Sequence, residues 1–112
     1  MNAYIGEVRR HPRFELRVDI EIKSRTSSVL KGRTVDISES GIAAMMRVDI
    51  PVGEVVELSF TLPLGQVAIY AIARERNAFR FGFEFVESNS SNEIIRHTCR
   101  QFAVEQSLTK TV

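Results

Sequence analysis

The sequence predicts an all-β domain, a six-stranded antiparallel β-barrel with one C-terminal α-helix and a flexible N-terminal arm. Three observations support this prediction. The 112 residues are enough for one hydrophobic core and too few for two. Segments of alternating apolar and polar residues recur, separated by short polar, glycine or proline turns. The one helical pattern begins at about residue 90, so we divide the chain into an arm, 1–13, and a barrel with its helix, 14–112.

The predicted strands follow one another in order. Between residues 14 and 23 the alternation is complete, which predicts one continuous half-buried strand. Residues 29–37 pair with it as a hairpin and end in a polar turn, where Gly41 is free to adopt a positive φ. Residues 42–47 are apolar on both faces, so we expect this strand to be covered on both sides. The remaining strands are predicted over 56–62, 67–74 and 79–86.

Four phenylalanines with a period of two occupy one face of the last predicted strand, namely Phe79, Phe81, Phe83 and Phe85. Such a ladder is typical of the inner face of a small barrel. A platform on which nucleic-acid bases stack is the alternative, but no basic residue alternates consistently beside the aromatic rings. We therefore interpret all four rings as barrel core.

The terminal helix is predicted from its cap and its apolar stripe. Ser90 and Glu93 fit the Ser-x-x-Glu capping box, and Ile95, Cys99 and Phe102 fall on one helical face. Because Cys99 is the single cysteine, an intrachain disulfide is excluded, and its place on the apolar stripe predicts a small buried side chain.

Composition and motifs exclude several classes of function. The net charge of +1 argues against a surface built to hold long nucleic acids, so any anion site must be local. No hydrolase, Walker-loop or metalloprotease motif is present, which predicts that the chain is not an enzyme, and no histidine or cysteine has zinc-ligand spacing, which predicts no metal site. The sequence has neither an apolar run long enough for a membrane span nor a signal-like N-terminus, so we expect a cytoplasmic protein.

The segment Arg9-Arg10-His11-Pro12-Arg13 places three guanidinium groups just before the first strand. Pro12 is incompatible with a helix interior, so the segment is expected to be extended and exposed. The planar fork of arginine matches a phosphate or the Hoogsteen edge of guanine with two parallel hydrogen bonds, which indicates a phosphorylated, guanine-containing ligand. A solvated basic tail without a ligand is the alternative.

Two motifs together resemble the signature of the PilZ domain family. The first is Arg9-x-x-x-Arg13 on the arm, and the second is Asp36-x-Ser38-x-x-Gly41 at the end of the second strand. The run Phe81-Gly82-Phe83-Glu84-Phe85 before a terminal helix is similar to the same family, so the resemblance covers nearly the whole chain.

The resemblance implies that the chain binds cyclic di-GMP, a bacterial second messenger, and needs no other cofactor. Arg9 and Arg13 would bind phosphate and guanine, and Asp36 would accept hydrogen bonds from guanine. Ser38 would form a hydrogen bond with guanine or phosphate, and Gly41 would let the backbone approach the ligand. For Arg10, stacking on a base and facing water both stay open.

With no second domain in the sequence, we expect a stand-alone receptor in which ligand binding orders the arm and so relays the signal to a separate partner protein. The alternatives are a protein-interaction module of the type IV pilus or motility machinery and a small-barrel binder of single-stranded nucleic acid.

Overall fold

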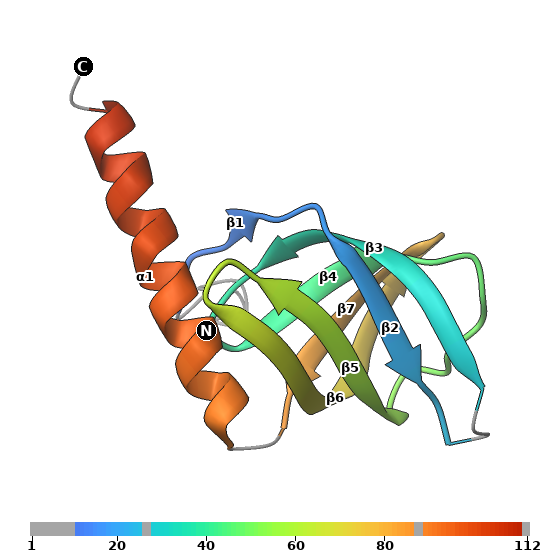
Figure 1. Cartoon of the computed structure of the whole chain (residues 1–112). Coiled ribbons are helices and arrows are strands. Elements are labelled where there is room, and N and C mark those ends of the chain that lie inside the picture. The colour runs from blue at the N-terminus through green and yellow to red at the C-terminus, as the bar shows by residue number, and fades with distance from the viewer. Residues whose placement is uncertain (1–10, 26–27, 87–88, 111–112) are drawn as a thin grey trace, which may run out of the picture.

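A computed structural model describes residues 11–25, 28–86 and 89–110, which form seven strands and one helix (Figure 1). The elements are β1 (Phe14–Glu15), β2 (Asp19–Lys23), β3 (Val29–Ile37), β4 (Gly41–Met45), β5 (Val55–Leu62), β6 (Gly65–Asn77), β7 (Arg80–Phe85) and α1 (Ser90–Lys110). All pairings are antiparallel, the sheet order is β1-β3-β2-β5-β6-β7-β4, and the additional β3–β4 pairing closes it. The predicted six-stranded barrel with a C-terminal helix is confirmed, and β1 is a short seventh strand added beside β3.

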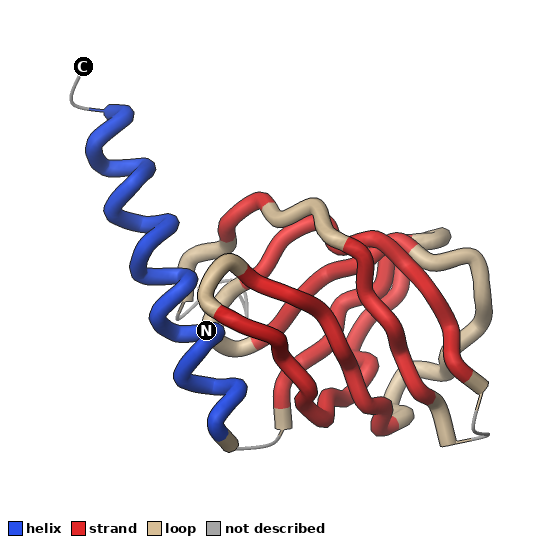
Figure 2. The backbone as a smooth tube through the Cα atoms, viewed as in Figure 1, coloured by secondary structure: helices blue, strands red, loops and turns tan. Residues whose placement is uncertain are grey.

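The core lies inside the barrel, where the strands wrap around a common interior (Figure 2). Alternation along β5 and β6 turns every second side chain inward, as the sequence predicts. These inward residues include Val56, Leu58, Phe60, Leu62, Val67, Ile69, Ala71 and Ala73. Burying each large aliphatic or aromatic side chain contributes about 1.5 to 3 kcal/mol, which makes this interior the main source of stability.

The predicted continuous strand over residues 14–23 is wrong, because residues 16–18 interrupt it and separate β1 from β2. The buried Thr34 of β3 explains the break. Its Oγ1 donates to the carbonyl of Leu16 at 2.5 Å and accepts from the amide of Val18 at 2.9 Å, so a side chain replaces a rung of the backbone ladder. All five alternating apolar residues still point inward or partly inward, since the break bends the chain without changing the faces.

The prediction that all four phenylalanines are core is wrong for Phe79. Phe81 and Phe83 are buried and Phe85 packs partly buried against the core, whereas Phe79 is 53% exposed. The cause is the position of the β6–β7 turn: β6 extends to Asn77 and β7 begins at Arg80, so Phe79 belongs to the turn. The prediction that the strand now labelled β4 is covered on both faces holds only in part. On its second face Ala43 is buried, but Met45 is 45% exposed.

The helix α1 lies against one end of the barrel, beside β1 and the β5–β6 turn (Figure 1). The helix is capped one residue earlier than predicted. Asn89 Oδ1 accepts from the amide of Ser91, and Asn92 Oδ1 accepts from the amide of Asn89. These two reciprocal hydrogen bonds replace the predicted Ser90–Glu93 capping box. Ile95 and Cys99 join the core, with Phe102 packed partly against it, and residues 103–109 extend beyond the barrel and are exposed. Burial, with a smaller contribution from the negative charge of Glu39, raises the pKa of the Cys99 thiol to about 11.

Candidate functional site

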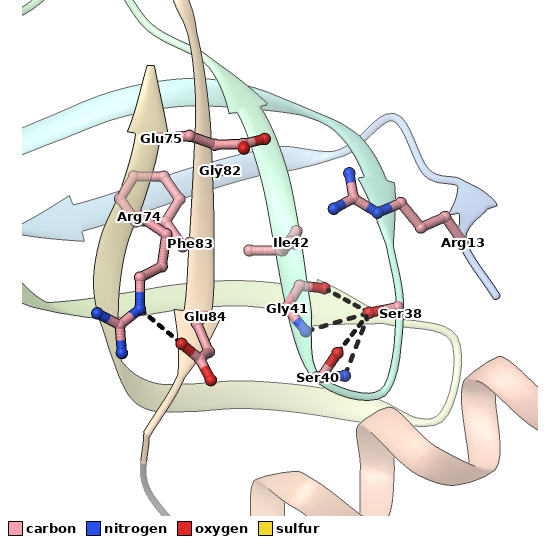
Figure 3. A pocket seen from close by; sticks show the side chains of 10 residues that line it. All are labelled: Arg13, Ser38, Ser40, Gly41, Ile42, Arg74, Glu75, Gly82, Phe83 and Glu84. Atoms are coloured by element: carbon pink, nitrogen blue, oxygen red, sulfur yellow. Dashed lines mark hydrogen bonds and ion pairs between the residues drawn. The ribbon is translucent and has the colours of Figure 1, made fainter. Parts of the chain in front are cut away.

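The turn between β3 and β4 is organised by Ser38. This buried residue accepts hydrogen bonds at Oγ from the amides of Ser40 and Gly41, both at 3.2 Å, and its own amide donates to the carbonyl of Gly41 at 2.9 Å (Figure 3). A short oxygen-bearing side chain that bonds nearby backbone is typical of turns. The motif serine therefore fixes the shape of the loop in which it lies.

Gly41 is needed for a close approach rather than for a positive φ. Its φ lies outside the left-handed region, contrary to the prediction, but a Cβ added at this position would lie 2.4 Å from the backbone carbonyl oxygen of Phe83 on β7. A backbone carbonyl cannot move aside as the end of a flexible side chain can, so no larger residue fits at position 41 without displacing β7. The motif glycine thus lets β4 pair closely with β7 beside the turn.

Asp36 stands next to this turn and holds two guanidinium groups. A β-bulge at Val35 interrupts the β3–β4 register just before it. Nη2 of Arg80 donates to Oδ2 of Asp36 at 2.9 Å, and Nη1 of Arg13 forms an ion pair with Oδ1 at 3.6 Å. The Asp36 side chain is 18% exposed, so its charge is partly shielded from water and oriented by cations from β7 and from the segment before β1.

A hollow of about 370 Å³ opens on the outside of the barrel beside Asp36. Arg13 and the Ser38–Gly41 turn line one side, and β6 and β7 line the other with Arg74, Glu75, Gly82 and Glu84 (Figure 3). The Nε of Arg74 donates to Oε1 of Glu84 at 2.6 Å, so this pair is neutralised. A polar, shallow surface with a cation on one wall suits an anionic ligand that carries hydrogen-bonding bases.

Of the predicted site residues, the structure brings together Arg13, Asp36, Ser38 and Gly41. Arg9 and Arg10 lie outside the described residues. His11, expected to be exposed, is partly buried, and its Nδ1 is shielded from solvent without a hydrogen-bond partner in the described part of the chain.

Sequence reasoning missed Arg80 and Glu75. Because Arg80 alternates with the phenylalanines, it points outward from β7, but nothing local indicates that it reaches a carboxylate 44 residues earlier in the chain. Glu75 follows a second bulge, at Arg74, which no sequence pattern revealed.

Two further searches of the described residues give negative results. No three histidine, cysteine or acidic side chains in the described ranges are grouped so that they could hold a metal ion. Within the same ranges, α1 is too polar to span a membrane.

Comparison with known proteins identifies the family. The family model for the PilZ domain matches residues 7–101. The chain belongs to the PilZ domain family. The match contains the whole barrel, both motifs and residues 90–101 of α1, so the PilZ domain accounts for every element that lines the hollow. A search of curated protein sequences found no match.

Several solved structures have the same fold. The PilZ domain of YcgR from Escherichia coli with c-di-GMP (cyclic di-GMP) superposes with a TM-score of 0.71 at 16% identity, over 92% of this chain and 97% of that one. The Bacillus subtilis inhibitor of motility, MotI/DgrA, gives 0.73 at 19% identity, over 92% of this chain and 53% of that one. The K. pneumonia MrkH–c-di-GMP complex gives 0.68 at 15% identity, over 93% and 53%. The chain thus spans about half the length of these last two proteins.

Proposed function

We propose that this PilZ domain is a receptor for cyclic di-GMP. The observation that carries the proposal is the ion pair, at 3.6 Å, between Asp36 and Arg13, which lines the outer hollow together with the Ser38–Gly41 turn. Residues 23 positions apart in the sequence meet here, and they belong to the two motifs that the family signature comprises. The YcgR and MrkH structures with this fold contain c-di-GMP, which supports the same ligand for this chain.

Each proposed contact follows from the chemistry of the side chain. The Arg13 guanidinium, together with Arg9, would donate bidentate hydrogen bonds to phosphate oxygens or to the O6 and N7 atoms of guanine. The Asp36 carboxylate would accept from the guanine ring N–H and amino group. Ser38 and Gly41 would present the backbone of the turn to the ligand, and Arg10 is a further candidate for base stacking. The role is recognition without a chemical reaction, in the cytoplasm, where we expect a second-messenger receptor to act.

Calorimetric titration with cyclic di-GMP tests the proposal. Truncating one partner of a shielded, charged hydrogen bond costs about 2 to 5 kcal/mol, so Arg13→Ala and Asp36→Ala should each weaken binding by at least about 30-fold. Their thermal stability should change little, because partly exposed ion pairs contribute only about 0 to 1 kcal/mol.

The matched controls are Arg33→Ala and Asp19→Ala. These residues form an exposed ion pair at 2.8 Å on the neighbouring strands β3 and β2, so the substitutions remove the same groups away from the hollow. Both controls should bind like the wild type. If Arg13→Ala and Asp36→Ala also bound normally, the assignment would fail.

We further propose that ligand binding relays the signal through the arm. Clustered arginines repel one another, and a doubly anionic ligand removes that repulsion, so binding should order residues 8–13 over the outer surface and create a new surface for a partner protein. Amide hydrogen exchange tests this step. Cyclic di-GMP should slow exchange in residues 8–13 and 36–41, whereas unchanged exchange in 8–13 would rule out the arm as the relay.

A further inference from the structure

Glu75 places a carboxylate on the wall of the hollow. It lies on the exposed side of β6, and its carboxylate has no hydrogen bond or ion pair among the residues that the structure describes. The neighbouring carboxylates differ: Glu84 pairs with Arg74, Asp49 with Arg76 and Asp36 with Arg80. An acceptor left open on the wall of a binding hollow is available to a ligand.

The strand register places Glu75 opposite Asp36 across the outer surface. Asp36 pairs with Ala43, Ala43 with Gly82, and Gly82 with Glu75, so one row crosses β3, β4, β7 and β6. The two middle residues of this row are small, and one carboxylate stands at each end. With strands about 4.8 Å apart, the two ends are about 14 Å from one another at their Cα atoms.

The same kind of backbone irregularity, a β-bulge, orients the side chains of both Asp36 and Glu75. A register shift precedes Asp36 in β3, and another precedes Glu75 in β6. Bulges of this kind re-aim a side chain, and they are frequent beside binding sites. Glu75 bends over Gly82: a Cβ on Gly82 would lie 2.9 Å from the Glu75 Cγ. Figure 3 shows its carboxylate directed across β7 toward β4, with the guanidinium of Arg13 directed toward it from the other side.

We propose that Glu75 reads the second guanine of the ligand, at the opposite end of the row from Asp36. This inference depends on the proposed function. Cyclic di-GMP carries two identical bases on one ring, so a site with one carboxylate at each end matches its symmetry. A carboxylate accepts from the guanine N1–H and 2-amino group together, whereas adenine presents an acceptor at N1 that the carboxylate repels. Glu75 therefore makes the site require guanine at both positions.

The substitution Glu75→Gln tests this assignment, because glutamine keeps the length of the side chain and exchanges one acceptor oxygen for a donor NH₂. Its amide complements adenine, with the NH₂ toward N1 and the oxygen toward the 6-amino group. The ligands to compare by calorimetry are cyclic di-GMP and the mixed cyclic GMP–AMP. Glu21→Gln on β2 is the control, since it makes the same charge change on a strand that does not line the hollow.

Wild-type protein and Glu21→Gln should both prefer cyclic di-GMP. One correct bidentate base contact is equivalent to about 5- to 150-fold in discrimination, so Glu75→Gln should lower this preference by at least about 5-fold, by losing cyclic di-GMP affinity and keeping or gaining affinity for the mixed ligand. An unchanged preference, an equal loss for both ligands, or tighter cyclic di-GMP binding through relieved repulsion would each overturn the inference. Absence of cyclic di-GMP binding in the wild type would instead refute the proposed function.

Discussion

At the scale of single residues, two phenylalanines of the aromatic run, one buried and one exposed, test the boundary of the core. Phe83 is 3% exposed and Phe79 is 53% exposed. Phe83→Ala should lose about 3 to 5 kcal/mol of unfolding free energy through lost burial and an unfilled cavity. Phe79→Ala should lose less than about 0.5 kcal/mol, as for other surface substitutions. Urea denaturation measures both, and a stable Phe83→Ala protein that no longer bound cyclic di-GMP would make this ring part of the ligand site.

Ser38 combines a motif position with a structural role. Because its Oγ accepts from two backbone amides, Ser38→Ala should leave these donors unsatisfied and cost about 1 to 3 kcal/mol in unfolding free energy. Ser40→Ala is the control, because Ser40 is exposed. This substitution removes the contact between the Ser40 and Ser38 hydroxyls at 3.2 Å and leaves the two backbone amides bonded to Ser38. If Ser38→Ala kept full stability and still lost ligand binding, its hydroxyl would act on the ligand directly rather than through the turn.

At the scale of elements, Thr34 joins β1 to the barrel and so positions Arg13. Its hydroxyl satisfies the carbonyl of Leu16 and the amide of Val18, both in the break between β1 and β2. Thr34→Val keeps the shape but leaves both groups unpaired, so we expect a loss of about 1 to 3 kcal/mol in unfolding free energy and faster amide exchange at Val18. Thr34→Ser keeps the hydroxyl and should protect Val18 like the wild type. Equal protection of Val18 in Thr34→Val would show that the hydroxyl does not hold the break.

The elements also show what the sequence could predict and what it could not. Alternation is a local property, so the strands and the inward faces of β5 and β6 follow from it directly. The break after Glu15 and the bulges at Val35 and Arg74 depend on how non-adjacent strands meet, and no local pattern encodes them. The motif positions Arg13 and Asp36 were predictable because the family resemblance supplies a long-range pairing that alternation lacks. Arg80 and Glu75 lie outside the motifs: Arg80 reaches Asp36 through a side-chain hydrogen bond from another strand, and the register shift at Arg74 places Glu75 beside Gly82.

At the scale of the whole molecule, the charge distribution distinguishes a receptor for a small ligand from a protein that binds long nucleic acids. The net charge is only +1, and several arginines of the outer surface are already paired with carboxylates, among them Arg33, Arg74 and Arg76. Such pairing leaves no continuous cationic path for a long phosphate backbone along these strands. A compact ligand that engages the cations around Asp36 is compatible with the same distribution.

The salt dependence of binding measures this difference. Cyclic di-GMP has two phosphates, so the slope of log K against log salt concentration should be no steeper than about −2, because each neutralised phosphate releases less than one counterion. A single strand held through six phosphates would give a slope of about −4. Titrations at several salt concentrations with cyclic di-GMP and with an oligonucleotide should show a shallow slope for the first and no tight binding of the second. Tight, steeply salt-dependent binding of the oligonucleotide would favour a nucleic-acid function, and in that case the exposed Phe79 would be the first aromatic residue to test as a stacking surface.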